Sequence, residues 1–339
     1  MGIQISDILP KQEIELNQLL GKRIAVDAFL WLHQFLSIIR QPDGTPLMDS
    51  KGRVTSHLSG VFYRSAKLLE KGIRLVWVFD GPKPKFKEVT TVKRAALREQ
   101  AKTKWQQALE AGKLADARTA AQATLGVTEE IINQSKELLD YMGIPVVQAP
   151  SEGEAQCAYM TKEKLAYATA SQDTDSLLFG TPMLVRNLSI TGKRKLPRQE
   201  TYIEVKPELI ELDKVLRELG INRGQLIVLG MLVGTDYNPG IKGIGPKRAL
   251  ELVKKEKTLN NILKKIEWNC ETPAEQIYDF FQNPPIDKKV KIKFSEPQPE
   301  KILNFMVNEF EFSQERVEKV IKTLQESKIR QTSLESWLK

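Results

Sequence analysis

Four short apolar runs in this chain are each closed or followed by acidic residues, and this repeated pattern limits the fold most. The runs span residues 22–27, 75–80, 145–149 and 165–170. The acids are Asp27, Asp80, Glu152, Glu154, Asp173 and Asp175. Short continuous apolar runs are typical of buried parallel strands covered by helices. Because ligands bind outside the carboxyl ends of such strands, we expect these acids to surround one site.

Carboxylates gathered in this way repel one another. Two like charges about 4 Å apart interact by roughly 4 kcal/mol at an effective dielectric constant of about 20. Bound cations or raised pKa values relieve this repulsion, and we expect cations here. Two other interpretations stay open. Ser151 and Glu154 have the spacing of a helix capping box, and Asp173-Thr-Asp-Ser fits an ordinary turn between a strand and a helix.

The composition is that of a globular protein with excess positive charge. The chain has 339 residues, 41% of them hydrophobic, which is enough for one large core or two smaller ones. Its longest apolar run, residues 226–233, is too short to cross a bilayer, so we expect no membrane segment and an intracellular location. Cys157 and Cys270 lie far apart, which fits a reducing compartment without a disulfide framework. The net charge of +8 suits a polyanionic partner.

A long basic segment follows the second apolar run. Residues 83–125 are rich in Ala, Gln, Lys and Glu, which predicts helices. Eight Lys or Arg but only two Glu fall between residues 83 and 104. A solvated helical face is the ordinary explanation, yet a basic insertion directly after an acidic strand end favours a mobile cap over a site. Lys87 and Arg94 are two helical turns apart and could reach the same phosphate.

The remaining elements are predicted from periodicity. Helices are expected at residues 28–39, 56–71, 128–142 and 222–233, with two amphipathic helices within 299–325. A further strand pair is expected at 183–187 and 200–205, with a basic turn at 191–195 between the two strands, and we expect the sheet to end near residue 205. Residues 289–294 alternate like an edge strand.

A glycine-rich turn follows the apolar helix at 222–233. Gly243-Ile-Gly245 stands directly before another helix, whose free N–H groups and positive dipole end suit a phosphate. Lys247 and Arg248 lie alongside. A plain helical hairpin is the alternative, but the order Gly-Ile-Gly-Pro-Lys favours contact with a DNA backbone.

The last residues form a polar segment with a few apolar side chains. Leu334 and Trp337 stand at helical spacing and follow Gln331. Packing of this tail against the body is one interpretation, and a docking peptide is the one we favour.

Eight short motifs stand in a fixed order along the chain. They are Met1-Gly-Ile-Gln, Ala25-Val-Asp-Ala, Thr55-Ser-His-Leu, Val78-Phe-Asp-Gly, Pro150-Ser-Glu-Gly-Glu-Ala-Gln, Ser171-Gln-Asp-Thr-Asp-Ser, Gly234-Thr-Asp-Tyr and Gly243-Ile-Gly-Pro-Lys-Arg. Together they resemble the flap endonucleases, the archaeal and eukaryotic structure-specific 5′ nucleases, over nearly the whole chain. The resemblance implies a three-layer α/β/α nuclease domain with a central, mostly parallel sheet, a helical arch over the site and a helix-two-turn-helix element.

The same resemblance implies a Mg²⁺-dependent DNA endonuclease. Such an enzyme cuts 5′ flaps at the junction of single strand and duplex, with 5′-3′ exonuclease activity, in Okazaki fragment maturation and repair. The implied cofactors are two Mg²⁺, with Mn²⁺ able to substitute, and K⁺ at the turn from Gly240 to Ile244. The implied partners are branched DNA with a 5′ flap and a DNA sliding clamp, and the implied location is with the chromosomal DNA.

The resemblance also assigns roles to residues. The implied metal ligands are Asp27, Asp80, Glu152, Glu154, Asp173, Asp175 and Asp236. Lys87 and Arg94 match the arch cations that hold the scissile phosphate. Expected DNA contacts are His33, Arg40, Arg64, Glu152, Gly234, Asp236, Gly243, Gly245, Lys247 and Arg248. The tail resembles a sliding-clamp box of Gln331, Leu334, Trp337 and Leu338, with Leu338 where a second aromatic residue is usual.

The expected regions of the chain overlap. They are an N-terminal nuclease region at 1–98, the arch at 83–127, an internal nuclease region at 116–258 with the helix-two-turn-helix near 225–258, a helical wrap at 259–325 and the clamp-binding tail at 326–339.

His33 stands where the family usually carries Tyr, six residues after Asp27. It lies about two turns along the helix that begins beside Asp27, so we expect its ring to meet the base next to the scissile phosphate. A histidine that only packs between helices is the alternative.

Two other classes of function remain possible on the sequence. Asp173-Thr-Asp-Ser could be the nucleophile loop of an aspartyl-phosphate phosphatase, although that chemistry does not need the Gly-Ile-Gly-Pro-Lys hairpin or the basic cap. A noncatalytic scaffold that binds DNA junctions would keep the hairpin and the tail. It would not need acids at every strand end.

Overall fold

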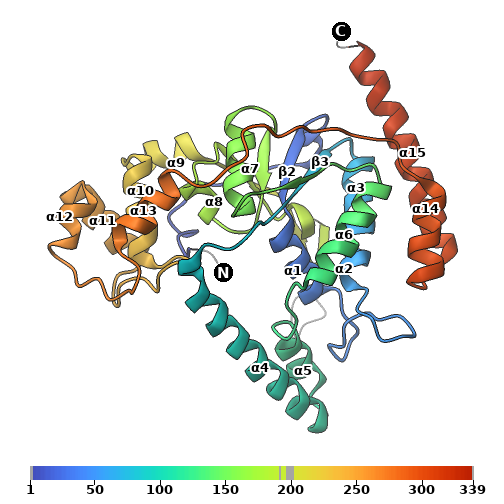
Figure 1. Cartoon of the computed structure of the whole chain (residues 1–339), viewed down its shortest axis with the longest axis horizontal. Coiled ribbons are helices and arrows are strands. Elements are labelled where there is room, and N and C mark those ends of the chain that lie inside the picture. The colour runs from blue at the N-terminus through green and yellow to red at the C-terminus, as the bar shows by residue number, and fades with distance from the viewer. Residues whose placement is uncertain (1–2, 191, 196–201, 338–339) are drawn as a thin grey trace.

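The structure, a computed structural model, describes residues 3–190, 192–195 and 202–337, and the side chains of residues 85, 88–95, 193–195, 202–203 and 327–337 lie outside the description. A seven-stranded sheet in the order β1-β9-β6-β5-β2-β3-β4 occupies the centre (Figure 1). Its strands are β1 Gln12–Glu13, β2 Arg23–Asp27, β3 Arg74–Phe79, β4 Val146–Gln148, β5 Ala168–Ala170, β6 Met183–Arg186 and β9 Glu208–Glu211.

Five neighbouring strands of this sheet are parallel. β2 pairs with β3 on one side and β5 on the other, and β4 and β6 extend the two sides. The expected parallel α/β sheet is therefore confirmed. The expectation that the sheet ends near residue 205 is wrong, because β9 and then β1 add an antiparallel edge. These edge strands are only four and two residues long and partly polar, so periodicity did not reveal them.

Helices cover one face of the sheet with a large apolar core. They are α1 Ala28–Ile38, α2 Ser56–Ser59, the π-helical turn η2 Gly60–Arg64, α3 Ser65–Glu70, α6 Glu129–Tyr141, α14 Pro299–Leu303, the π-helical turn η5 Asn304–Glu309 and α15 Gln314–Trp337. On β2, Ile24 and Val26 face this core, whereas Ala25 packs in the core on the other face. This alternation is the two-residue period of a strand.

A second set of helices covers the opposite face, which gives three layers (Figure 1). They are α7 Gly153–Lys162, α8 Asp175–Leu178, α9 Leu212–Leu219, α10 Arg223–Val233, α11 Pro246–Glu256, α12 Leu259–Leu263 and α13 Ala274–Gln282. α10 and α11 pack together and carry the predicted glycine-rich turn between them. Short 3-10 turns occur at η1 Leu16–Leu19, η3 Lys85–Lys87 and η4 Leu188–Ile190.

The basic segment forms the predicted helices. α4 Glu88–Glu110 and α5 Leu114–Ala121 make a helical hairpin that projects from the body (Figure 1). The loop that follows α1 contacts both helices of the hairpin: the Trp105 indole in α4 donates to the Asp43 carbonyl at 3.2 Å. Gly44, at φ +90°, lies so close to α5 that a Cβ there would be 2.7 Å from the Ala121 Cβ.

The C-terminal helices are as predicted, but the expected edge strand at residues 289–294 is wrong. Val290, Ile292 and Phe294 pack on the core beneath α7, β3 and β4, and this alternate burial produced the strand-like pattern. The described residues provide no strand partner for this segment. Alternation reports which side chains are buried, and it does not by itself provide a neighbouring strand.

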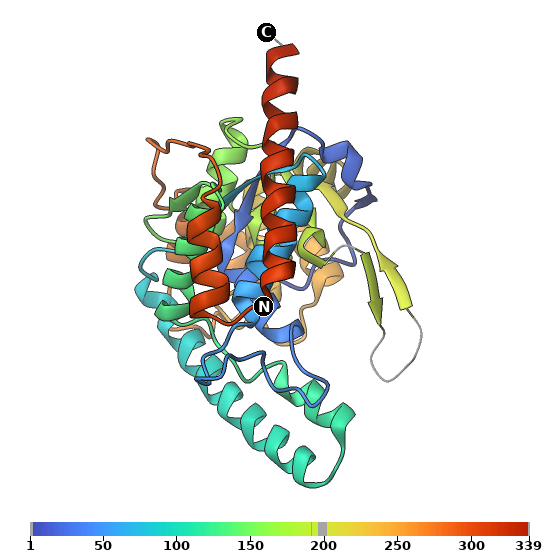
Figure 2. The same cartoon turned by 90° about the vertical axis from the view of Figure 1, so that its right-hand side faces the viewer.

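Strands lie within 183–187 and 200–205 as predicted, but their expected pairing across a turn at 191–195 is wrong, because β6 pairs with β5 and β9 and the turn segment is itself a strand. β7 Gly192–Lys195 and β8 Tyr202–Val205 form a separate two-stranded ladder that lies beside the main body (Figure 2). α15 extends from the body at the opposite end from the α4–α5 hairpin (Figure 2). Over the described residues, the chain lacks a helix of the length and apolar character needed to span a membrane.

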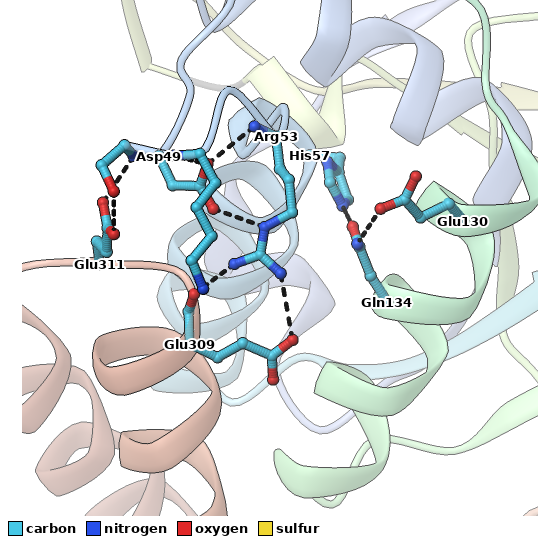
Figure 3. A network of polar contacts seen from close by, with 9 residues as sticks. Asp49, Arg53, His57, Glu130, Gln134, Glu309 and Glu311 are labelled. Carbon is cyan, nitrogen blue, oxygen red and sulfur yellow. Dashed lines mark hydrogen bonds and ion pairs between the residues drawn. The ribbon is translucent and has the colours of Figure 1, made fainter.

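Polar contacts fasten the loop before α2 to the C-terminal helices (Figure 3). Arg53 pairs with Asp49 at 2.7 Å and with the Glu309 carboxylate at 3.4 Å, and the Glu311 carboxylate accepts from the Ser50 N–H at 2.7 Å. Nearby, the fully buried His57 ring contacts the Gln134 amide oxygen at 2.8 Å and so joins α2 to α6. Burial lowers the pKa of His57 to about 4, despite the opposing bond to Gln134.

His57 should make stability depend on pH. Its pKa is about 4 when folded and about 6.5 when unfolded, so the unfolded chain binds the proton first. Its contribution is therefore complete above pH 6.5 and is lost as the pH falls toward 4, by up to about 3 kcal/mol. Denaturant unfolding of wild type and His57→Leu between pH 7.5 and 4 measures the difference, and parallel curves would contradict this expectation.

Candidate active site

The predicted acids meet at the point where the strand order reverses. The chain runs from β2 outward to β3 and β4 and then returns to β5 on the other side of β2. Asp27 closes β2, Asp80 follows β3, and Asp173 follows β5. Glu152 and Glu154 stand at the start of α7, Asp175 opens α8, and Asp236 follows α10. A reversal point of this kind is where ligands bind in open α/β sheets.

These carboxylates are close enough to perturb one another. Burial first, and then repulsion from Asp80, raises the pKa of Asp27 to about 7. Burial and repulsion from Glu152 raise the pKa of Asp80 to about 6. Burial and repulsion from Asp173 also raise the pKa values of Glu154 and Asp175. Repulsion from Asp236 contributes to the raised pKa of Asp175, as repulsion from Glu152 does to that of Asp80. Electrostatic repulsion therefore links all seven predicted acids.

Backbone N–H groups fix three of the carboxylates. Asp80 accepts from the Gly153 N–H at 2.7 Å, and Asp27 accepts from the Leu30 N–H at 3.1 Å as the N-cap of α1. Asp175 accepts from the Ile3 N–H at 2.7 Å, which brings the N-terminal segment to the site. The side chains are thereby oriented before any ligand binds.

Two serines support the acids and were not predicted. The Ser171 hydroxyl lies 3.1 Å from Asp27 and 3.2 Å from Glu154, and the Ser176 hydroxyl lies 2.8 Å from Glu154. Both stand beside the acidic pair in the sequence, so their spacing was the available signal. The capping-box interpretation is wrong: Glu152 is the N-cap of α7, and Glu154 contacts the serines instead.

Lys87 reaches into the acidic cluster from the base of the arch. Its ammonium lies 2.7 Å from Glu152, 3.6 Å from Asp236 and 5.5 Å from the centre of the Tyr237 ring. Burial would lower the pKa of Lys87, but the carboxylates of Glu152 and Asp236 raise it above its ordinary value. The structure thus brings Lys87 to the acids, as the charge pattern suggested, whereas the side chain of Arg94 lies outside the described residues.

The donor set fits Mg²⁺ in chemistry. All seven acids offer oxygen ligands, and the raised pKa values of Asp27, Asp80, Glu154 and Asp175 reflect a site that favours added positive charge. Among the described residues, no three His, Cys, Asp or Glu side chains are already arranged to hold a metal. Lys87 lies between Glu152 and Asp236, and Ser171 lies between Asp27 and Glu154. Water, which Mg²⁺ retains in part of its shell, would complete such a site.

The arginines predicted to contact the duplex are partly enclosed. The Arg40 guanidinium donates to the Leu36 and Gly44 carbonyls at 2.8 Å, and burial lowers its pKa to about 10. Burial also lowers the pKa of Arg64, which is half-buried in η2. His33 is half-buried in α1, and its carbonyl accepts from the Ser37 hydroxyl at 2.8 Å.

The glycine-rich turn has the expected form. Gly245 is the N-cap of α11, Pro246 begins that helix, and Lys247 and Arg248 are exposed. Gly234 and Gly240 have φ of +115° and +77°, and a Cβ at Gly240 would lie 2.4 Å from the Val233 carbonyl oxygen. Of the predicted tail contacts, Gln331, Leu334 and Trp337 lie in α15 with side chains outside the description, and Leu338 lies outside the described residues.

Known proteins are similar to this chain in sequence and in fold. Residues 1–101 match the XPG N-terminal domain and residues 143–236 match the XPG I-region. Flap endonuclease 1 of Thermococcus onnurineus is 54% identical over 340 residues, covering 99% of each chain. This chain belongs to the flap endonuclease family. Flap endonuclease 1 of Pyrococcus furiosus is 53% identical over 342 residues, covering 100% of each chain.

Solved structures of the family agree with the fold. Flap endonuclease-1 from Methanococcus jannaschii has a TM-score of 0.77 at 39% identity, covering 96% of this chain and 98% of that chain. The catalytic core of Rad2 in complex with a DNA substrate has a TM-score of 0.72 at 26% identity, covering 96% of this chain and 100% of that chain. As a family member, this flap endonuclease is a structure-specific, DNA-cleaving hydrolase that depends on a divalent metal, typically Mg²⁺. The family, fold and activity implied by the motifs are confirmed.

Gly153 should be essential for the orientation of Asp80. A Cβ at this position would lie 2.6 Å from the Asp80 carboxylate oxygen that accepts the Gly153 N–H. We expect Gly153→Ala to displace the carboxylate and slow single-turnover flap cleavage by about 100-fold. The helix should not lose stability, because Ala is favoured over Gly in helices by about 1 kcal/mol. Lys162→Ala, at an exposed position of α7, is the matched control, and an active, normally folded Gly153→Ala enzyme would contradict the assignment.

Proposed function

We propose that this chain cleaves 5′ flaps at the junction of single strand and duplex by a two-metal mechanism, with 5′-3′ exonuclease activity. The observation that carries the proposal is the gathering of seven carboxylates at the strand-order reversal, beside a basic arch. Asp27, Asp80, Glu152, Glu154, Asp173, Asp175 and Asp236 would hold two Mg²⁺, or Mn²⁺ in their place. When bound, the ions supply an activated water and charge stabilisation of the leaving oxygen.

The protein's own contribution to this reaction is to bind and orient the phosphate. Lys87 lies in η3 at the base of the arch and Arg94 belongs to α4, and we assign both to the scissile phosphate as cations. For Lys87 this requires the ammonium to exchange Glu152 or Asp236 for a phosphate oxygen. Backbone bonds to Asp27, Asp80 and Asp175 keep the acids in place during that exchange.

The glycine-rich turn is proposed to hold the duplex. The first N–H groups of α11 lack partners within the helix, and together with the exposed Lys247 and Arg248 they suit a phosphate, while Gly243 and Gly245 allow close approach of a DNA backbone. We assign K⁺ to the carbonyls of residues 240–244. The turn would thus fix the register of the DNA without reading its sequence.

Further DNA contacts are proposed at His33, Arg40, Arg64, Glu152, Gly234 and Asp236. For Arg40 the contact requires the guanidinium to exchange its bonds to the Leu36 and Gly44 carbonyls for a phosphate. His33 lies on α1, whose N-cap is Asp27, and stacking on a base is the role we assign to its ring.

The proposed divisions of the chain follow these roles. Residues 1–98 and 116–258 form the nuclease regions, with the helix-two-turn-helix near 225–258, and residues 83–127 form the arch. Residues 259–325 wrap the nuclease, and residues 326–339 bind a DNA sliding clamp through Gln331, Leu334, Trp337 and Leu338. The enzyme would act inside the cell on chromosomal DNA, during Okazaki fragment maturation and repair.

The metal assignment is tested with Asp173→Asn and a labelled 5′ flap duplex. We expect cleavage by wild type only when Mg²⁺ is present, and none by the variant, whose flap affinity should stay within a few fold because positioning comes from phosphate contacts. Asp213→Asn, at an exposed position of α9, is the control. Near-normal cleavage by Asp173→Asn would contradict the assignment of Asp173 as a metal ligand. Binding without cleavage by wild type would indicate a scaffold instead.

The clamp assignment is tested by deletion of residues 331–339. We expect cleavage without a clamp to be unchanged and stimulation by the clamp to be lost, because a docking peptide supplies local concentration and not chemistry. Gln325→Ala, at an exposed position of α15 outside residues 326–339, is the control. Stimulation that survives the deletion would show that the clamp binds elsewhere.

A further inference from the structure

An aromatic cluster joins the base of the arch to the helix-two-turn-helix element. Phe86 lies in η3, one residue before Lys87 and directly before α4. Its ring centre is 5.3 Å from that of Tyr237 and 5.2 Å from that of Phe280, both edge to face. Tyr237 and Phe280 are themselves 5.2 Å apart, so the three rings form a closed triangle.

The three rings come from segments that are far apart in the sequence. Tyr237 follows Asp236 in the turn after α10 and is 5% exposed. Phe280 lies in α13, where its neighbour Phe281 is buried and also packs on Tyr237, at 5.3 Å between ring centres. Phe86 therefore inserts the base of the arch into the core that supports the glycine-rich turn.

Two consecutive arch residues contact two consecutive residues of the turn. Phe86 packs on Tyr237, and Lys87 pairs with Asp236 and Glu152. Two contacts of different chemistry limit the rotation of η3 more than either contact alone. Aromatic pairs of this geometry are worth about 0.5 to 1.5 kcal/mol beyond their buried area, and they are directional.

We infer that Phe86 is a positioning residue: its ring, held by Tyr237 and Phe280, fixes the place of the Lys87 ammonium relative to the carboxylates. The contribution of Lys87 to cleavage therefore depends on the turn that follows α10, within the helix-two-turn-helix. This inference rests on the phosphate-binding role proposed above for Lys87. Since a displacement of about 1 Å in a reacting group can slow catalysis by about 100-fold, even a small shift of η3 would be measurable.

The kinetic test is a double-mutant cycle on single-turnover flap cleavage. We expect Phe86→Ala to slow cleavage by about tenfold with flap affinity changed less than about threefold, and Phe86→Leu to restore most of the rate. In a Lys87→Ala background, Phe86→Ala should slow cleavage by less than about twofold. Leu97→Ala is the control, because Leu97 lies on α4 and its side chain is 59% exposed.

A second measurement uses the protein without DNA or metal. Lysine acetylation followed by mass spectrometry should label Lys87 several-fold faster in Phe86→Ala than in wild type, because the ammonium loses its fixed ion pairs. Lys102 of α4, whose side chain is 49% exposed, should be labelled equally in both proteins and serves as the internal control.

The outcomes separate this inference from the proposed function. If Phe86→Ala slows the wild type and the Lys87→Ala enzyme by the same factor, or if Lys87 labelling does not change, Phe86 is only a packing residue. If Lys87→Ala cleaves as fast as wild type, the proposed role of Lys87 fails, and the inference fails with it.

Discussion

The repulsion among buried carboxylates is the constraint on which the rest of this structure depends. Strands β2, β3 and β5 deliver their acids to one place, and a free cluster of this kind would drive the strand ends apart. The surrounding residues offset it with hydrogen-bond donors. The N–H groups of Leu30, Gly153 and Ile3, the hydroxyls of Ser171 and Ser176, and the Lys87 ammonium all point at these oxygens.

Helix ends contribute to the same balance. Asp27 is the N-cap of α1, and Glu152 is the N-cap of α7, so both acids lie at the positive ends of helix dipoles. Each such placement stabilises a negative charge by typically 0.3 to 1 kcal/mol. Burial, together with the remaining repulsion, raises the pKa values of Asp27, Asp80, Glu154 and Asp175, and a divalent cation would relieve the repulsion. The repulsion among these carboxylates thus lowers the stability of the folded protein at the site where the family performs its chemistry.

The arch is tied to the body at two places, by different kinds of contact. At its base, Phe86 and Lys87 join it to the turn after α10. Farther out, Trp105 and α5 rest on the loop that follows α1, where only glycine fits at position 44. The base contact combines an apolar cluster with ion pairs, whereas the outer contact combines the bond from the Trp105 indole to a backbone carbonyl with close packing of Gly44 on α5.

The sequence alone predicted the layers of the fold and the acids that gather at the strand ends, because each depends on the residue pattern of a short segment. A buried strand needs a continuous apolar run, and the acid that closes it marks the strand end. The sequence did not predict the edge strands β1 and β9, because such short strands carry only a weak pattern. It wrongly predicted a strand at residues 289–294, because their alternate burial imitates a strand pattern. The tertiary structure alone decided that Arg40 is enclosed by backbone carbonyls, that Ser171 lies between Asp27 and Glu154, and that Phe86 packs on Tyr237. These contacts join residues far apart in the chain, and only the packing of whole elements brings them together.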